Sequence, residues 1–225
     1  GSSDPFKRQM VQLRQQAGIG QKEIEFKDFG MGPLRRMLPA YLRLADGYML
    51  GLIFTVAVEK TIPSLFGPAP DASQRAMAAL GQLGYENIPP KVAEKLFRVV
   101  HIVAFLIALL ARAGQKIFWM TDHDSIAETK EKHDLLLKVF GQVLPLYTRS
   151  TFSLIGSARP FSPRATEYLD ILSYADVAAG SVAHYFDGLD RQGHEHVTIK
   201  DGGQHVLRLL CHDSTVLKKF CMKVW

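Results

Sequence analysis

Two aspartates follow an apolar stretch in the middle of the chain. Residues 116–122 (KIFWMTD) are mostly aromatic, apolar and β-branched, which predicts a buried strand. Asp122 and Asp124 come at its end, before a predicted helix. Ligands of α/β proteins collect at the carboxyl ends of strands, and carboxylates suit hard cations such as Mg²⁺. We therefore interpret both as candidate metal ligands. The alternative is that they are turn residues, a common role for Asp.

Asp176 is the second acidic candidate. It lies in residues 172–183 (LSYADVAAGSVA), a predicted helix whose other side chains are small or apolar. An acid on a buried face needs a cation or another polar partner. The nearby alanines and Gly180 would let this helix lie close to a sheet, bringing Asp176 near the end of that sheet. A salt bridge to an Arg is the simpler explanation.

The elements that would position these acids alternate along the chain. Helices are predicted over residues 5–17, 34–44 (bent at Pro39), 90–112 and 166–186, and from a capping box at 125–128. Strands are predicted over residues 48–59, 116–122 and 151–157, with an edge strand or extended link at 22–29 (KEIEFKDF) and a hairpin and last strand in the tail. Residues 61–75 are rich in Pro and Gly and predict a mobile loop. The expected fold is α/β, a mixed sheet with helices on both faces.

The composition sets limits on partners and compartment. The 225 residues hold 27 Lys and Arg against 22 Asp and Glu, a net charge of +5, which favours anionic partners such as nucleic acid. Two cysteines are too few for a disulfide scaffold. The most apolar stretch, 102–111, is shorter than the about 20 residues of a membrane span. We expect a cytoplasmic protein with no membrane partner. No P-loop, G-x-G-x-x-G motif or nucleophile elbow occurs.

Several motifs together resemble the bacterial domain-of-unknown-function 3800 family. Its members have an E-x-K-F-like segment, an aspartate after a central strand, and a Q-x-A-D-x-x-A-G helix near the end. Here Glu23-Ile24-Glu25-Phe26-Lys27, Asp122 and Ala175-Asp176-Val177-Ala178-Ala179-Gly180 are similar to these three elements, in that order. The chain departs from the pattern twice. Ser173 or Tyr174 stands at the glutamine, and the family's opening D-E-S strand is not present.

The resemblance implies a ribonuclease-H-like domain over residues 1–225 that lacks an N-terminal strand. Either upstream residues are absent from this chain, or the protein itself lacks the first ligand. The resemblance also implies metal-assisted phosphodiester hydrolysis with Mg²⁺ or Mn²⁺. Asp122 and Asp176 would be ligands, joined by Asp124, Glu23 or Glu25. Lys27 would contact a phosphate, or is simply an exposed lysine.

Three functions are consistent with these observations. The first is a metal-dependent nuclease acting on RNA or DNA. The second is a catalytically inactive ribonuclease-H-like module that binds a protein or nucleic acid. The third is a nucleotide hydrolase using the same carboxylates. The helix over residues 92–111 is apolar around nearly its whole circumference, so it is either a homodimer seam or a buried core helix.

Overall fold

The first helix illustrates how local sequence sets the ends of an element. In the computed structural model, α1 spans Pro5–Ala17, as predicted. Asp4 caps it by accepting a hydrogen bond from the Phe6 amide at 3.0 Å, and Pro5 occupies the first turn, where no amide is needed. Gly18 ends the helix in the left-handed conformation, at a φ of 67°.

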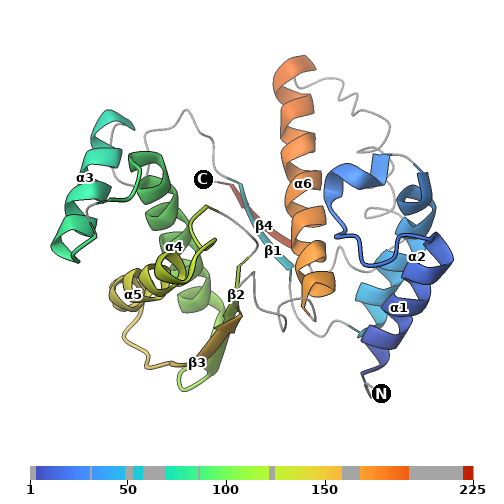
Figure 1. Ribbon diagram of the computed structural model, residues 1–225, viewed down its shortest axis with the longest axis horizontal. Helices are drawn as coiled ribbons and strands as arrows, with labels where there is room; N and C mark the ends of the chain where they lie inside the picture. Colours follow the sequence, from blue (N-terminus) through green and yellow to red (C-terminus); the bar gives the residue numbers. More distant parts are fainter. Residues whose placement is uncertain are drawn as a thin grey trace. The chain divides into compact units, whose positions relative to one another are not determined.

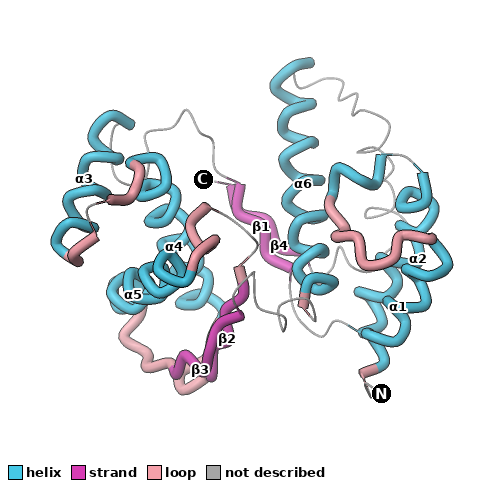
Figure 2. Tube along the Cα trace, in the orientation of Figure 1, coloured by secondary structure: helices cyan, strands magenta, loops and turns pink. Residues whose placement is uncertain are grey.

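The structure describes residues 4–30, 32–48, 53–57, 69–85, 87–121, 125–158, 168–192 and 220–224. The chain divides into two units (Figures 1 and 2). Unit 1 combines Gly1–Val58 with Tyr168–Trp225, and unit 2 is Glu59–Glu167. Each unit is described by itself below. The prediction of one domain over residues 1–225 stays a prediction.

Unit 1 is built around one long helix. Besides α1 it contains the 3₁₀ helix η1 (Phe26–Gly30), α2 (Gly32–Tyr48), β1 (Ile53–Ala57), α6 (Leu169–Gln192) and β4 (Phe220–Val224). Helix α6, orange in Figure 1, contacts β1 and also η1. The buried side chains of α6 join those of α1 and α2 in one core. Strands β1 and β4 pair in parallel, with Ile53 opposite Phe220.

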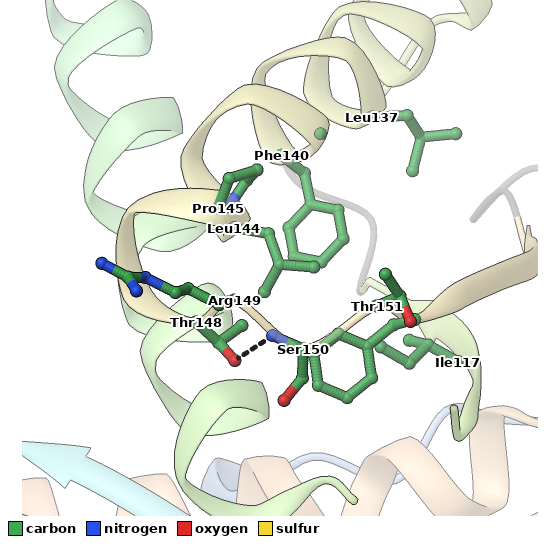
Figure 3. A pocket seen from close by; sticks show the side chains of 11 residues that line it. Ile117, Leu137, Phe140, Leu144, Pro145, Thr148, Arg149, Ser150 and Thr151 are labelled. Carbon is green, nitrogen blue, oxygen red and sulfur yellow. Dashed lines mark hydrogen bonds between the residues drawn. The ribbon is translucent and has the colours of Figure 1, made fainter. Parts of the chain in front are cut away.

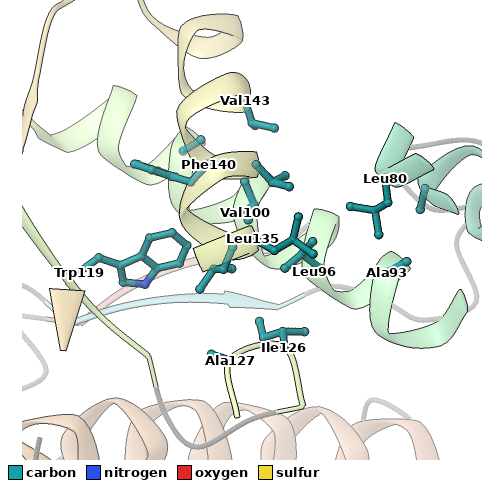
Figure 4. Packing of buried hydrophobic residues seen from close by; sticks show 14 residues of the cluster. Leu80, Ala93, Leu96, Val100, Trp119, Ile126, Ala127, Leu135, Phe140 and Val143 are labelled. Carbon is teal, nitrogen blue, oxygen red and sulfur yellow. The ribbon is translucent and has the colours of Figure 1, made fainter. Parts of the chain in front are cut away.

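Unit 2 contains α3 (Ala69–Gln82), α4 (Pro90–Leu110), β2 (Lys116–Met120), α5 (Lys130–Tyr147) and β3 (Ser153–Ala158). Strands β2 and β3 are parallel and are connected through α5, which is a β-α-β unit. Figure 4 shows the core, in which Trp119 of β2 lies against Phe140 of α5 with 4.9 Å between ring centroids. Leu96 and Val100 of α4 and Leu80 of α3 extend the same cluster.

The predicted mixed sheet with helices on both faces is wrong. The described residues are mostly helical, and their strands form two separate two-stranded parallel pairs, β1–β4 and β2–β3. The strands predicted at residues 48–59, 116–122 and 151–157 correspond to β1, β2 and β3, which are shorter, and Tyr48 belongs to α2 instead. Each of these strands pairs with one partner among the described strands. Apolar and β-branched runs identify a strand, but they do not determine how many neighbours it has.

Three local predictions are also corrected. Residues 22–25 form a link, the second of the two predicted alternatives, whereas Phe26–Gly30 form η1 and not an edge strand. The capping box at residues 125–128 forms a turn, because Thr129 caps α5 instead by accepting from the Lys132 amide. The predicted loop over 61–75 is wrong from Ala69 onward, since α3 begins there with Pro70 in its first turn, a position that tolerates proline. Residues 61–68 and the predicted tail hairpin lie outside the described residues.

Helix α4 packs against both α3 and α5. Four of its side chains are buried in the core of unit 2, namely Ala93, Leu96, Val100 and Ala104. Its apolar circumference is thus partly explained by packing within the unit, while Leu109 and Leu110 at its end are exposed. The homodimer seam over residues 92–111 stays a prediction.

Across the described segments, no helix has the length and apolar character needed to cross a membrane.

Candidate functional site

Arg14 of α1 holds the following segment against α6. The residue is 7% exposed, and its Nε donates to Oδ1 of Asp170 at 3.0 Å. Its Nη1 donates to the carbonyls of Gly20 at 3.2 Å and Lys22 at 2.5 Å. A buried guanidinium is tolerated when several acceptors surround it. Because Asp170 lies in the first turn of α6, this network sets the path of the link along that helix.

Two stacked tyrosines join α2 to α6 in the core of unit 1. The rings of Tyr41 and Tyr174 are 4.1 Å apart, and the Tyr174 hydroxyl donates to the Tyr41 carbonyl at 2.6 Å. The Tyr41 hydroxyl lies 2.7 Å from Ser173 Oγ. Burial raises the pKa of both phenols, so both stay protonated at neutral pH. Ser173 and Tyr174, the two alternatives for the position of the glutamine in the family motif, are both core residues here.

Asp176 contacts Phe26 across a sequence separation of 150 residues. Its Oδ2 accepts a hydrogen bond from the Phe26 backbone amide at 2.7 Å. Phe26 is the first residue of η1, so the carboxylate satisfies an amide at a helix start, where no internal acceptor exists. Asp176 itself is exposed, whereas Val177 and Ala178 are buried. The prediction that Asp176 lies on a buried face is wrong, because the helical period directs Val177 and Ala178 inward instead.

The residues on either side of Phe26 form an ion pair. The ammonium of Lys27 binds the carboxylate of Glu25. This pair raises the pKa of Lys27, and the negative charges of Asp28 and Asp176 raise it further. Asp176 is thus within electrostatic reach of Lys27. Three predicted site residues, Glu25, Lys27 and Asp176, come together in unit 1.

The Phe26 side chain lies over Gly180, one turn beyond Asp176. A Cβ atom added at Gly180 would lie 2.6 Å from the Phe26 Cβ and nearer still to the ring. Real Cβ atoms do not approach that closely, so only glycine fits beneath this ring in this arrangement. A further turn along α6, the His184 ring is 5.9 Å from the Phe26 ring, at an interplanar angle of 58°. The sequence prediction did not single out Phe26, Gly180 or His184 for this contact.

The other predicted ligands are Asp122, Asp124 and Glu23. Asp122 and Asp124 lie outside the described residues, and their place in the chain assigns them to unit 2. Their metal-binding role stays a prediction. Glu23 is exposed in the link before η1. Among the residues that the structure describes, no three His, Cys, Asp or Glu side chains are grouped so that they could hold a metal ion.

Unit 2 has a separate, largely apolar hollow of about 500 Å³ (Figure 3). It lies between β2, α5 and the connection from α5 to β3, and its walls include Ile117, Phe140 and Leu144. In the connection, Thr148 Oγ1 accepts from the Ser150 amide at 3.0 Å. The guanidinium of Arg149 points away from the apolar side chains in Figure 3. The hollow is therefore an apolar cavity, and the described residues that line it include no cluster of reactive side chains.

Comparison with known proteins found no match to the chain among family models, curated proteins or solved structures. The likeness to the domain-of-unknown-function 3800 family thus rests on the motifs alone.

Proposed function

We propose that the chain is a divalent-metal-dependent nuclease of the cytoplasm, which hydrolyses phosphodiester bonds of RNA or DNA. One observation carries this proposal. The Asp176 carboxylate accepts a hydrogen bond from the Phe26 amide, 150 residues away in the sequence, and the chain neighbours of Phe26, Glu25 and Lys27, form an ion pair. Carboxylates supply oxygen ligands for a hard cation, and an ammonium supplies a positive charge for a phosphate. Both kinds of group occur together here.

The donor types fit Mg²⁺ or Mn²⁺. A carboxylate has about four lone-pair positions, so the hydrogen bond from the Phe26 amide leaves Asp176 with acceptor capacity for a cation. Glu25 would exchange its Lys27 partner for the cation, which places the freed ammonium next to an incoming phosphate. When bound, such a cation activates water and stabilises the leaving oxygen.

Calorimetric titration with Mn²⁺ tests the proposal, because two variants of Asp176 separate its two roles. Asp176→Asn keeps an oxygen that can accept from the Phe26 amide but removes the charge that a cation needs. Asp176→Ala removes both. We expect the original chain to bind Mn²⁺ and Asp176→Asn to lose binding while its thermal unfolding stays unchanged. Equal Mn²⁺ affinity in the original chain and Asp176→Asn would refute the role of Asp176.

Control variants sharpen this experiment. Glu128→Gln removes an acid from an exposed ion pair with Lys132 in unit 2, and it should bind Mn²⁺ normally. Glu25→Gln should weaken binding, and Asp122→Asn tests the ligand predicted from sequence alone. Cleavage of labelled single-stranded RNA and DNA in Mn²⁺, compared with the same reaction in excess chelator, then tests the nuclease activity itself.

A catalytically inactive module that binds a protein or nucleic acid is the second candidate. The observation in its favour is that both carboxylates already have protein partners, the Phe26 amide for Asp176 and Lys27 for Glu25. On this interpretation the cluster only holds η1 against α6. Asp176→Ala would then lower stability, Asp176→Asn would not, and no variant would bind Mn²⁺. Nucleic-acid binding that weakens steeply with salt would identify the partner as RNA or DNA.

A further inference from the structure

Three residues of α6 at four-residue spacing all contact Phe26. Asp176 accepts a hydrogen bond from the Phe26 amide, and Gly180 lies beneath the Phe26 side chain. The His184 ring lies against the Phe26 ring. Residues spaced by four share one face of a helix. One face of α6, formed by Asp176, Gly180 and His184, therefore contacts the backbone, the Cβ atom and the ring of Phe26.

The close approach at Gly180 makes this contact restrictive. The atoms that a Cβ at Gly180 would meet are Cβ, Cγ and Cδ1 of Phe26, which lie at the root of the side chain. Rotation of the side chain could move Cγ and Cδ1 aside, but Cβ is bonded to the backbone and can move only if the backbone of Phe26 moves. Displacing that backbone shifts Glu25 and Lys27 as well, because they are its neighbours in the chain.

We propose that Phe26 and Gly180 are positioning residues, which set the distance of Glu25 and Lys27 from Asp176. This inference rests on the proposed function, since it assigns the contact a role in the metal site. Neither residue carries a group that binds a cation. Their effect is on geometry. The ring over Gly180 fixes how close η1 lies to α6, and the hydrogen bond from the Phe26 amide to Asp176 fixes the position of η1 along that helix.

Gly180→Ala and Phe26→Ala test the proposal, alone and combined, in the full chain. Gly47→Ala is a matched control, because Gly47 is also a helical glycine of unit 1 but has no atom within 4 Å of an added Cβ. Two quantities are measured for each variant. The first is the exchange rate of the residue-26 amide by nuclear magnetic resonance, and the second is the affinity for Mn²⁺ by calorimetry.

We expect Gly180→Ala to speed exchange of the residue-26 amide and to weaken Mn²⁺ binding by about tenfold, typical of residues that orient ligands. Gly47→Ala should change neither. The double variant should bind Mn²⁺ no more weakly than the weaker single variant, because both changes remove one contact.

Two results overturn the inference. One is an unchanged exchange rate of the residue-26 amide in Gly180→Ala. The other is a loss of Mn²⁺ affinity in the double variant that equals the sum of the two single losses. If the original chain binds no Mn²⁺, the proposed function fails instead, and with it the role in a metal site. The amide exchange still reports whether Gly180 positions η1, so the two failures can be told apart.

Discussion

Replacing Arg14 by Met should destabilise unit 1 by several kilocalories per mole. Methionine keeps the length and apolar character of the side chain but removes every donor. The change breaks the ion pair with Asp170 and leaves the carbonyls of Gly20 and Lys22 without this donor. Removing one partner of a buried ion pair costs about 3–5 kcal/mol. The Asp170 side chain is 20% exposed, so water recovers part of this loss and we expect about 2–4 kcal/mol.

The assay is urea unfolding, combined with amide hydrogen exchange followed separately over α1 and α5. With a slope of about 2 kcal/mol/M, a loss of this size moves the urea midpoint by roughly 1–2 M. Faster exchange should be confined to unit 1. Arg8→Met is the control, because Arg8 is exposed on the same helix and should change stability by less than about 0.5 kcal/mol. If Arg14→Met unfolds with the same midpoint as Arg8→Met, the network does not hold the link to α6.

Three further predictions concern side chains of the two units. Burial lowers the pKa of His101, so the unfolded chain binds more protons than the folded one in the range just below pH 6.5. Stability of unit 2 should therefore fall as pH drops through that range, and His101→Phe should flatten this part of a plot of urea midpoint against pH. Tyr41→Phe removes the hydroxyl that lies 2.7 Å from Ser173 Oγ, while Ser173 still donates to the Asp170 carbonyl. The change should cost about 1 kcal/mol in urea unfolding, with the helical circular-dichroism spectrum unchanged. Phe140→Ala opens a cavity beside Trp119 and should cost about 3–5 kcal/mol, seen as faster amide exchange over α5.

The parts of the fold that the sequence predicted well depend on local patterns. Helix α1 was predicted residue for residue, because its cap, its proline and its closing glycine are all within the segment. The segment Lys22–Phe29 shows the opposite case. Ile24 and Phe26 alternate with charges as in a strand, but η1 forms because Asp176 caps it from α6. Nothing in the local pattern indicates a partner so far away in the sequence.

The candidate site divides in the same way. The family resemblance grouped Glu25, Lys27 and Asp176, and in the structure Asp176 accepts from the amide of Phe26, which lies between Glu25 and Lys27 in the chain. Their role in a site stays a prediction. The sequence prediction missed Arg14, although a signal existed. Arg14 belongs to the same helical stripe as Met10 and Leu13, so a charged residue on the buried face of α1 already required a partner. The identity of that partner, Asp170, could come only from the three-dimensional structure.

The division of the chain has a consequence for the order of folding. Unit 2 is continuous in sequence, whereas unit 1 needs residues from both sides of it, such as Phe26 and Asp176. During synthesis, unit 2 emerges complete while α1, η1 and α2 still lack α6. Contacts of such high sequence separation slow folding. Closing the longer loop costs little in stability, about 0.6 kcal/mol for each doubling of its length. We expect unit 2 to form first and the cluster at Asp176 to be among the last features to assemble.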